Sequence, residues 1–294
     1  MIRFFSLTLL LTLVFSVSIA HAGSLSFCDG EREPTAAEQD VVLRFTALIK
    51  QELEASGARA ALVSRSGLDL ALLHQRYSHA GLALRDSANA GLGPWSVRQL
   101  YYACDEGIPR IFDQGLAGFV LGLHDTREGY VSLVLLPDST LAQAARDDHL
   151  ALSLLGAQYS ANAYAFGLSY QNCNQWLAEL MAAAWGQADT RAAAQAWLQE
   201  AGYAPTEISL WRPITWLAAF SPYLHNDDRT ADDAEHGRYR VSLPASLEAF
   251  VRAQAPQAQR IELCHRGREV VIHRGWAPLL EGCVAGPSDE SLVL

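Results

Sequence analysis

Cys173 stands at the predicted start of a helix. Apolar residues recur at helical spacing over residues 176–185, and Asn172 followed three positions later by Gln175 is typical of a helix start. Cys173 would then lie in the first turn, where unpaired N–H groups and the positive end of the helix dipole favour a thiolate. The thiolate is the nucleophilic form of cysteine. We therefore predict that Cys173 is a nucleophile; the alternatives are a small buried residue or one half of a disulfide.

His79 supplies the second group that acyl transfer needs. The alternation over residues 77–86 predicts a strand, on which His79, Gly81 and Ala83 share one face. The two small residues would let another element, such as a helix, come close enough for its side chains to reach the imidazole. An imidazole can accept a thiol proton while the sulfur attacks a carbonyl carbon. The alternative is a histidine at a strand end that bonds only to backbone.

Two short motifs resemble those of a known enzyme group. They are Ser-His-Ala-Gly-Leu-Ala at residues 78–83 and Asn-Cys-Asn-Gln-Trp-Leu at residues 172–177. Their order is similar to that of circularly permuted papain-like cysteine hydrolases of the NlpC type, in which the histidine strand precedes the cysteine helix. The whole chain also resembles an uncharacterised family of exported proteobacterial proteins, a domain of unknown function. The resemblance implies that Cys173 is the nucleophile and His79 the general base.

Such enzymes usually orient the imidazole with a third polar residue on the neighbouring strand. Residues 95–102 are predicted to form that strand, and Gln99 is its best-placed candidate. A glutamine accepts a hydrogen bond but cannot offset imidazolium charge as a carboxylate would. Tyr170, Asn172 and Trp176 flank the cysteine and are predicted to line a substrate site, although Asn172 is alternatively only the helix cap.

The N-terminus is typical of a secretory signal. Arg3, an apolar run over residues 4–19 and Ala-His-Ala before Gly23 predict a signal peptide over residues 1–22, with an uncleaved anchor as the competing interpretation. We expect a periplasmic or secreted protein with no stable membrane insertion after cleavage. The chain has 294 residues and a net charge of −10 with no basic run, which argues against nucleic acid or anionic membrane as a partner.

Five cysteines in an exported chain predict disulfides. An odd number leaves at least one thiol over. Cys264 and Cys283 bracket a short segment and are predicted partners, while a Cys28–Cys104 bridge would tie the N-terminus to the body. This assignment leaves Cys173 free, although four cysteines allow three pairings.

The predicted elements favour an α+β fold with a mainly antiparallel sheet packed against helices. Residues 23–190, with an N-terminal helix, would form a papain-like core, and residues 191–294 a C-terminal extension of helices and a hairpin packed on it. One helix is expected from about residue 139 to 155, and a short one at residues 213–220. Residues 226–236 are predicted to form a polar acidic loop.

No metal or cofactor is predicted. The residues with ligand-type side chains in the acidic loop fit no known ligand spacing; they are Asp227, Asp228, Asp232, Asp233 and His236. Near the C-terminus, Cys264, His265, His273 and Cys283 are zinc-type ligands. Adjacent strand residues point to opposite faces, however, so Cys264 and His265 cannot easily share one ion.

We therefore expect an exported cysteine hydrolase that cleaves an amide or ester in the cell envelope. By analogy, the substrate would be an envelope peptide, peptidoglycan or an acylated component. The alternative is a non-catalytic periplasmic binding or structural module that retains a degraded papain-like cleft. A thiol redox protein is disfavoured because the chain has no Cys-x-x-Cys motif.

Overall fold

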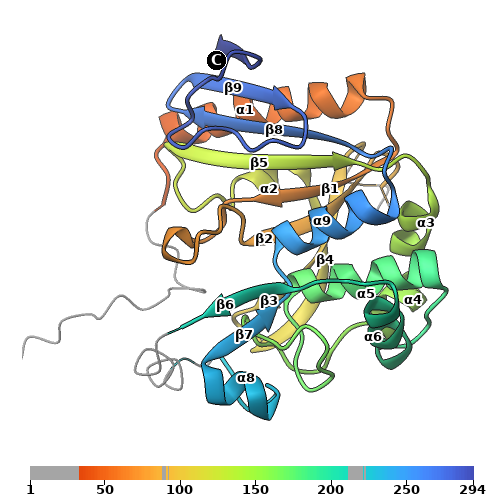
Figure 1. Ribbon diagram of the computed structural model, residues 1–294. Helices are drawn as coiled ribbons and strands as arrows, with labels where there is room; N and C mark the ends of the chain where they lie inside the picture. The colour runs from red at the N-terminus through yellow and green to blue at the C-terminus, as the bar shows by residue number, and fades with distance from the viewer. Residues whose placement is uncertain (1–32, 88–90, 92, 211–220, 222) are drawn as a thin grey trace, which may run out of the picture. The chain divides into compact units, whose positions relative to one another are not determined.

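The computed structural model describes residues 33–87, 91, 93–210, 221 and 223–294 (Figure 1). The predicted signal peptide, Cys28 and the helix predicted at residues 213–220 lie outside the described residues. The elements of the fold belong to one unit, Pro34–Leu294.

One eight-stranded sheet organises this unit, and all its pairings are antiparallel. Its spatial order is β10-β9-β8-β5-β1-β2-β3-β4. The α+β class with a mainly antiparallel sheet is thus confirmed. Residues 191–294, predicted as an extension, contribute the last three strands beside β5 (Figure 1). The strands are β1 (Ala60–Arg65), β2 (His79–Leu84), β3 (Ser96–Ala103), β4 (Ile108–Gly115), β5 (Glu128–Leu135), β8 (Gln259–Arg266), β9 (Glu269–Arg274) and β10 (Glu290–Val293).

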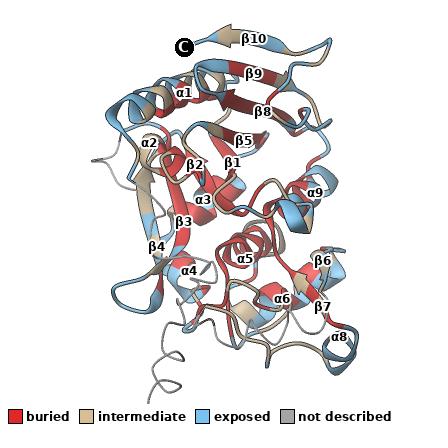
Figure 2. Cartoon of the chain, turned by 90° about the vertical axis from the view of Figure 1, so that its left-hand side faces the viewer, coloured by how far each residue is buried: buried red, intermediate tan, exposed pale blue. Residues whose placement is uncertain are grey.

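Helices cover both faces of the sheet (Figure 2). On one face, α1 (Ala36–Ala55) and α2 (Leu116–Val120) share a buried apolar cluster with alternate strand residues such as Val63 and Ala83. The other face carries α3 (Thr140–Arg146), α5 (Cys173–Gly186) and α9 (Pro244–Gln254). Period-two alternation explains this division, because successive side chains of a strand point to opposite faces.

The remaining described elements are helix α6 (Arg191–Glu200), a two-stranded sheet and short helices. Helix α6 packs on α5 and starts after its cap, Thr190, whose side chain accepts from Ala193 N at 3.3 Å. A small second sheet pairs β6 (Thr206–Ser209) with β7 (Arg238–Val241), beside α8 (Ala231–His236). The other described helices are the single turn η1 (Ala71–Leu73) and α4 (Asp148–Ser153).

Two predictions about helices were wrong. The single helix expected over residues 139–155 is two helices, α3 and α4, because the Asp147 side chain caps a new start by accepting from Leu150 N at 3.1 Å. The acidic loop expected over residues 226–236 ends in α8, which Thr230 caps in the same way. In both cases a capping side chain starts a helix at a residue where the sequence predicted no helix start.

The Cys264–Cys283 disulfide is confirmed and joins β8 to the C-terminal segment. Cys104 is also disulfide-bonded; its predicted partner, Cys28, lies outside the described residues. Cys173 is the free cysteine of the part of the chain that the structure describes. Over the same residues, none of the helices combines the length and apolar character needed to cross a bilayer.

Candidate functional site

Helix α5 begins where the sequence predicted, with Cys173 as its first residue. Asn172 is the N-cap, and its Oδ1 accepts from Gln175 N at 2.7 Å. The Asn172 amide nitrogen donates to two carbonyls, those of Ala161 and Ser242, at 3.3 Å each. The helix start is therefore fixed on both sides of the cap, and the position of the thiol is fixed with it.

Asn174 joins the start of α5 to strand β2. Its Oδ1 accepts from Ala80 N and its Nδ2 donates to Ser78 O, each at 3.1 Å. The pairing of β2 with β3 covers only Leu82–Leu84 on the β2 side, which leaves the first residues of β2 for Asn174. Cys173 thus enters the fold where β2 and β3 separate.

The face of β2 that holds Gly81 and Ala83 does admit a helix whose side chain reaches the imidazole, as predicted, and that helix is α2. A Cβ added at Gly81 would overlap Val97 of β3, so the missing side chain makes room for the neighbouring strand. Ala83 packs in the cluster shared with α1 and α2. The helix that approaches His79 on this face is α2, whose Phe119 ring lies 5.8 Å from the imidazole, centroid to centroid.

His79 and Gln99 are in direct contact, as their positions on neighbouring strands predicted. His79 Nε2 lies 2.5 Å from Gln99 Oε1, and Gln99 Nε2 donates to Gln114 Oε1 at 2.7 Å. An amide oxygen can only accept, so Nε2 of the imidazole carries the proton and Nδ1 keeps a lone pair. Gln99 therefore selects the tautomer in which Nδ1 is the free base.

Arg65 is the direct cross-strand neighbour of His79. Its side chain lies over the Phe119 ring, 4.7 Å from the centroid, and one guanidinium nitrogen donates to Phe119 O. The hydroxyl of Tyr101 interacts with the same guanidinium. Arg65 is only 5% exposed. A buried cation therefore shares the site with the imidazole.

Cys173 is 7% exposed, and several hydrogen-bond donors interact with its thiol. The backbone N–H groups of Cys173 and Asn174 and the hydroxyl of Tyr159 interact with the sulfur, and the charge of Arg65 acts on it. Burial nevertheless raises the pKa of the Cys173 thiol to about 12, and the donors and Arg65 only partly oppose this. The helix start does favour the thiolate, as the sequence indicated, but desolvation is the larger effect.

The imidazole is held neutral. Burial, and then the charge of Arg65, lower the pKa of His79 to about 3, and the hydrogen bond to Gln99 opposes this shift. His79 and Cys173, both described, share no hydrogen bond. At rest the site therefore holds a neutral thiol and a neutral imidazole, with Arg65 as the charge that acts on both.

The predicted substrate-binding residues have structural partners. Trp176 is fully buried and its indole N–H donates to Ala151 O at 3.2 Å. Tyr170 stacks on His225 with ring centroids 4.3 Å apart, and its hydroxyl donates to Asp227. Contact of Tyr170, Asn172 or Trp176 with a substrate stays a prediction. What the structure adds is that Asn172 is the helix cap.

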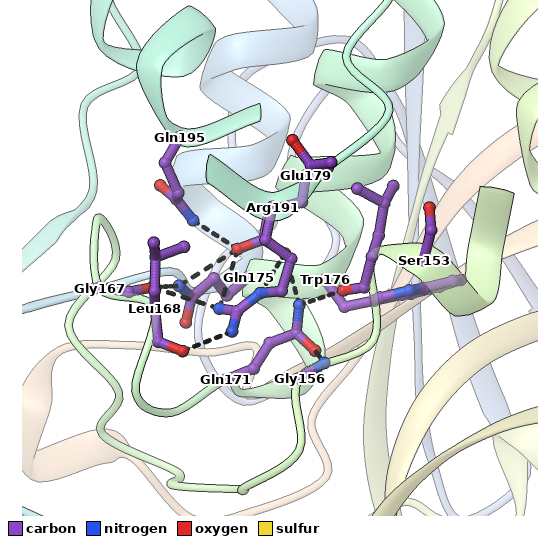
Figure 3. Close-up of polar contacts among 12 residues, drawn as sticks. Ser153, Gly156, Gly167, Leu168, Gln171, Gln175, Trp176, Glu179, Arg191 and Gln195 are labelled. Carbon is purple, nitrogen blue, oxygen red and sulfur yellow. Dashed lines mark hydrogen bonds and ion pairs between the residues drawn. The ribbon is translucent and has the colours of Figure 1, made fainter. Parts of the chain in front are cut away.

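A buried polar network, absent from the sequence predictions, surrounds Glu179 two turns further along α5 (Figure 3). The Glu179 carboxylate accepts from Arg191 Nε at 2.9 Å and Arg191 Nη2 at 3.1 Å, and it also accepts from Gln171 and Gln195. Arg191 further donates to three loop carbonyls, those of Gly167, Leu168 and Tyr170. The loop that leads into the cysteine helix is therefore tied to the helix by this pair.

The metal-type residues singled out from the sequence bind other groups of the described chain. Asp233 of α8 binds Arg238 and Arg240 at 3.2 and 2.8 Å. Cys264 is in the disulfide, and His273 contacts Asp289 at 2.6 Å. Over the described residues, no group of three or more metal-type side chains gathers in one place.

Sequence reasoning missed Arg65, Tyr159 and Asn174 as parts of the site. Arg65 carried a signal, because a charged residue closing an apolar strand invites the question of its partner. Tyr159 and Asn174 carried none. Their roles depend on where two distant segments meet in the folded chain.

The sequence matches the pattern of one protein family over residues 52–251, described as an uncharacterized protein conserved in bacteria (DUF2145). The matched segment runs from the last turn of α1 into α9 and contains His79, Gln99 and Cys173. No curated protein and no solved structure matches the chain.

Proposed function

The chain belongs to the DUF2145 family of proteins conserved in bacteria, and from the chemistry of its site we propose that it is a cysteine hydrolase that cleaves an amide or ester bond. Cys173 is the nucleophile, His79 the general base and Gln99 the residue that orients the imidazole. A papain-like origin of the site belongs to the same proposal. So does export to the cell envelope, with an envelope peptide, peptidoglycan or an acylated component as substrate.

One observation carries the proposal: the free thiol sits among groups that stabilise negative charge on sulfur. Two N–H groups of the helix start, the Tyr159 hydroxyl and the charge of Arg65 all favour the thiolate of Cys173. A cysteine that only fills space needs none of them. The other described cysteines are disulfide-bonded, so Cys173 alone offers a thiol for chemistry.

The residues support a two-step acyl transfer. The thiol proton passes to His79 Nδ1 while the sulfur bonds to the carbonyl carbon, and the carbonyl π electrons move to oxygen. When this oxyanion collapses, the C–N or C–O bond breaks and the leaving amine or alcohol takes the proton from His79. Water, deprotonated by the same imidazole, then cleaves the thioester, which releases the acid and restores the thiol.

Binding without catalysis is the second candidate function, and a specific observation favours it. Burial raises the pKa of Cys173 to about 12 and lowers the pKa of His79 to about 3, so proton transfer between them is uphill in the resting site. In this case the two side chains would only line a cleft that binds an envelope component.

Turnover of envelope extracts separates the two functions. The wild type should release new amines, alcohols or acids, and Cys173→Ala and His79→Gln should each lower the rate at least about a hundredfold. His149→Gln, at an exposed histidine of α4, is the matched control and should keep the full rate. Equal turnover by the wild type and Cys173→Ala, or binding of an extract component with no product, would establish the non-catalytic alternative.

A further inference from the structure

Arg65 is a buried cation without an acidic partner. The residue is 5% exposed, and its Nε, which is buried, has no hydrogen-bond partner. No carboxylate among the described residues forms an ion pair with it or acts on its charge. Burying a charge is costly unless a partner compensates for it. Other buried arginines of the chain, such as Arg98 and Arg260, do pair with carboxylates.

The fold holds this guanidinium firmly in place. Arg65 is the last residue of the apolar strand β1, and its guanidinium lies over the Phe119 ring and donates to Phe119 O. A Cβ at Gly122 would overlap it, so the backbone after α2 closes against the charge. The position of Arg65 is thus fixed by packing, without an opposite charge.

The ionisable side chains around Arg65 come from four segments of the described chain. His79 faces it from β2, Tyr101 from β3, Cys173 from α5, and Tyr159 contacts Cys173 from the loop before α5. Helix α2 contributes only apolar side chains. Of these groups, only cysteine and tyrosine can become anions, and cysteine has the lower ordinary pKa. Cys173 is therefore the expected partner for the charge of Arg65.

We propose that Arg65 is the counter-charge of the Cys173 thiolate, and so takes the role that an imidazolium has in a thiolate–imidazolium pair. The inference rests on the proposed function, since it assumes that Cys173 is the nucleophile. Arg65 is a positioning residue that acts through the sulfur. Its charge lowers the pKa of Cys173 and also lowers that of His79, so it favours a thiolate beside a neutral imidazole.

In the test reaction, where no substrate is bound, the chemical step is an ionisation of Cys173 followed by attack on the probe. The thiol proton leaves to hydroxide, which forms water, and the sulfur keeps the electron pair next to the guanidinium. With iodoacetamide as a neutral probe, the thiolate then forms a C–S bond and expels iodide. The rate at a given pH therefore reports the fraction of thiolate.

The experiment follows alkylation of Cys173 by iodoacetamide, read by mass spectrometry, in the folded full chain from neutral to alkaline pH. Arg65→Met should slow alkylation by about 10- to 1000-fold at each pH, because loss of a nearby opposite charge raises a pKa by roughly 1–3 units. Arg65→Lys keeps the charge and should recover most of the rate. His79→Gln should change it by less than about threefold, because His79 is neutral in the resting site.

Results other than these would contradict either the role of Arg65 or that of Cys173. If Arg65→Met reacts like the wild type, or if His79→Gln slows the reaction more, Arg65 is not the counter-charge, while turnover of extracts still decides the hydrolase. If folded wild type never reacts although urea-unfolded chain does, both the nucleophile and the inference fail. The far-ultraviolet absorbance of the thiolate gives the same comparison without a reagent. It is measured as the difference between the chain with Cys173 and the Cys173→Ser variant, once with Arg65 present and once with Arg65→Met. Arg65→Gln serves as a second neutral variant should Arg65→Met not fold.

Discussion

Helix α5 carries two buried polar centres of opposite construction. At Glu179 each charge meets an opposite charge, and the carboxylate also accepts from Gln171 and Gln195 (Figure 3). At Cys173 the nearby cation, Arg65, meets only neutral groups. Both centres are buried, so the difference does not arise from exposure to water.

The difference separates a structural centre from a reactive one. A buried ion pair with all its donors used holds segments in place, and Arg191 thereby ties the loop before α5 to the helix. A buried charge without a partner stabilises nothing by itself, but it favours any anion that forms beside it. Removal of Arg191 should therefore mainly lower stability, whereas removal of Arg65 should mainly lower the reactivity of Cys173.

The largest expected effect is on stability, from removal of Arg191. Arg191→Met leaves the fully buried Glu179 carboxylate without its cation, which should lower the free energy of unfolding by about 3–5 kcal/mol. Arg65→Met leaves no carboxylate unpaired, and Phe119 O still accepts from Gly122 N, so its loss should stay below about 1 kcal/mol. Urea unfolding of both variants measures the contrast.

The double variant Arg191→Met with Glu179→Gln controls for lost packing. It should recover part of the stability, because a neutral amide costs less to bury than an unpaired carboxylate. Equal losses for Arg191→Met and Arg65→Met would remove the distinction between the two centres.

A smaller effect tests how the reactive centre is held. Gly81→Ala should destabilise the fold by about 1–3 kcal/mol, because the new methyl overlaps Val97 of β3. The shift of β3 should also move Gln99 away from His79 and lower the hydrolysis rate. Adding Val97→Ala makes room for the methyl, so the double variant should regain stability relative to Gly81→Ala. No regain would mean that packing between β2 and β3 does not position the pair.

The sequence predicted the parts of the site better than their surroundings. The cap, the helix start and the strands of His79 and Gln99 follow from local patterns, and the free state of Cys173 follows from the odd number of cysteines and the pairing expected of the others. These predictions are confirmed. The pKa of Cys173 was not predictable in this way, because desolvation depends on what covers the thiol, and that cover comes from distant segments. Arg65 is the clearest case, because its lack of an acidic partner is a property of the folded chain.

For each pH unit, the smallest expected effect is the pH dependence of stability. This measurement isolates the reactive centre. Folding lowers the pKa of His79 from 6.5 to about 3, so the unfolded chain binds a proton there first. Stability should therefore fall below pH 6.5, by at most about 1.4 kcal/mol per pH unit for this group, and His79→Gln should remove that share.

Folding raises the pKa of Cys173 from 9 to about 12, so stability should fall as the pH rises above 9, and Cys173→Ser should remove that loss. Urea unfolding at acidic and alkaline pH measures both the acidic and the alkaline limb of the plot of stability against pH. An alkaline limb that survives in Cys173→Ser would show that the thiol is not the group that burial holds neutral.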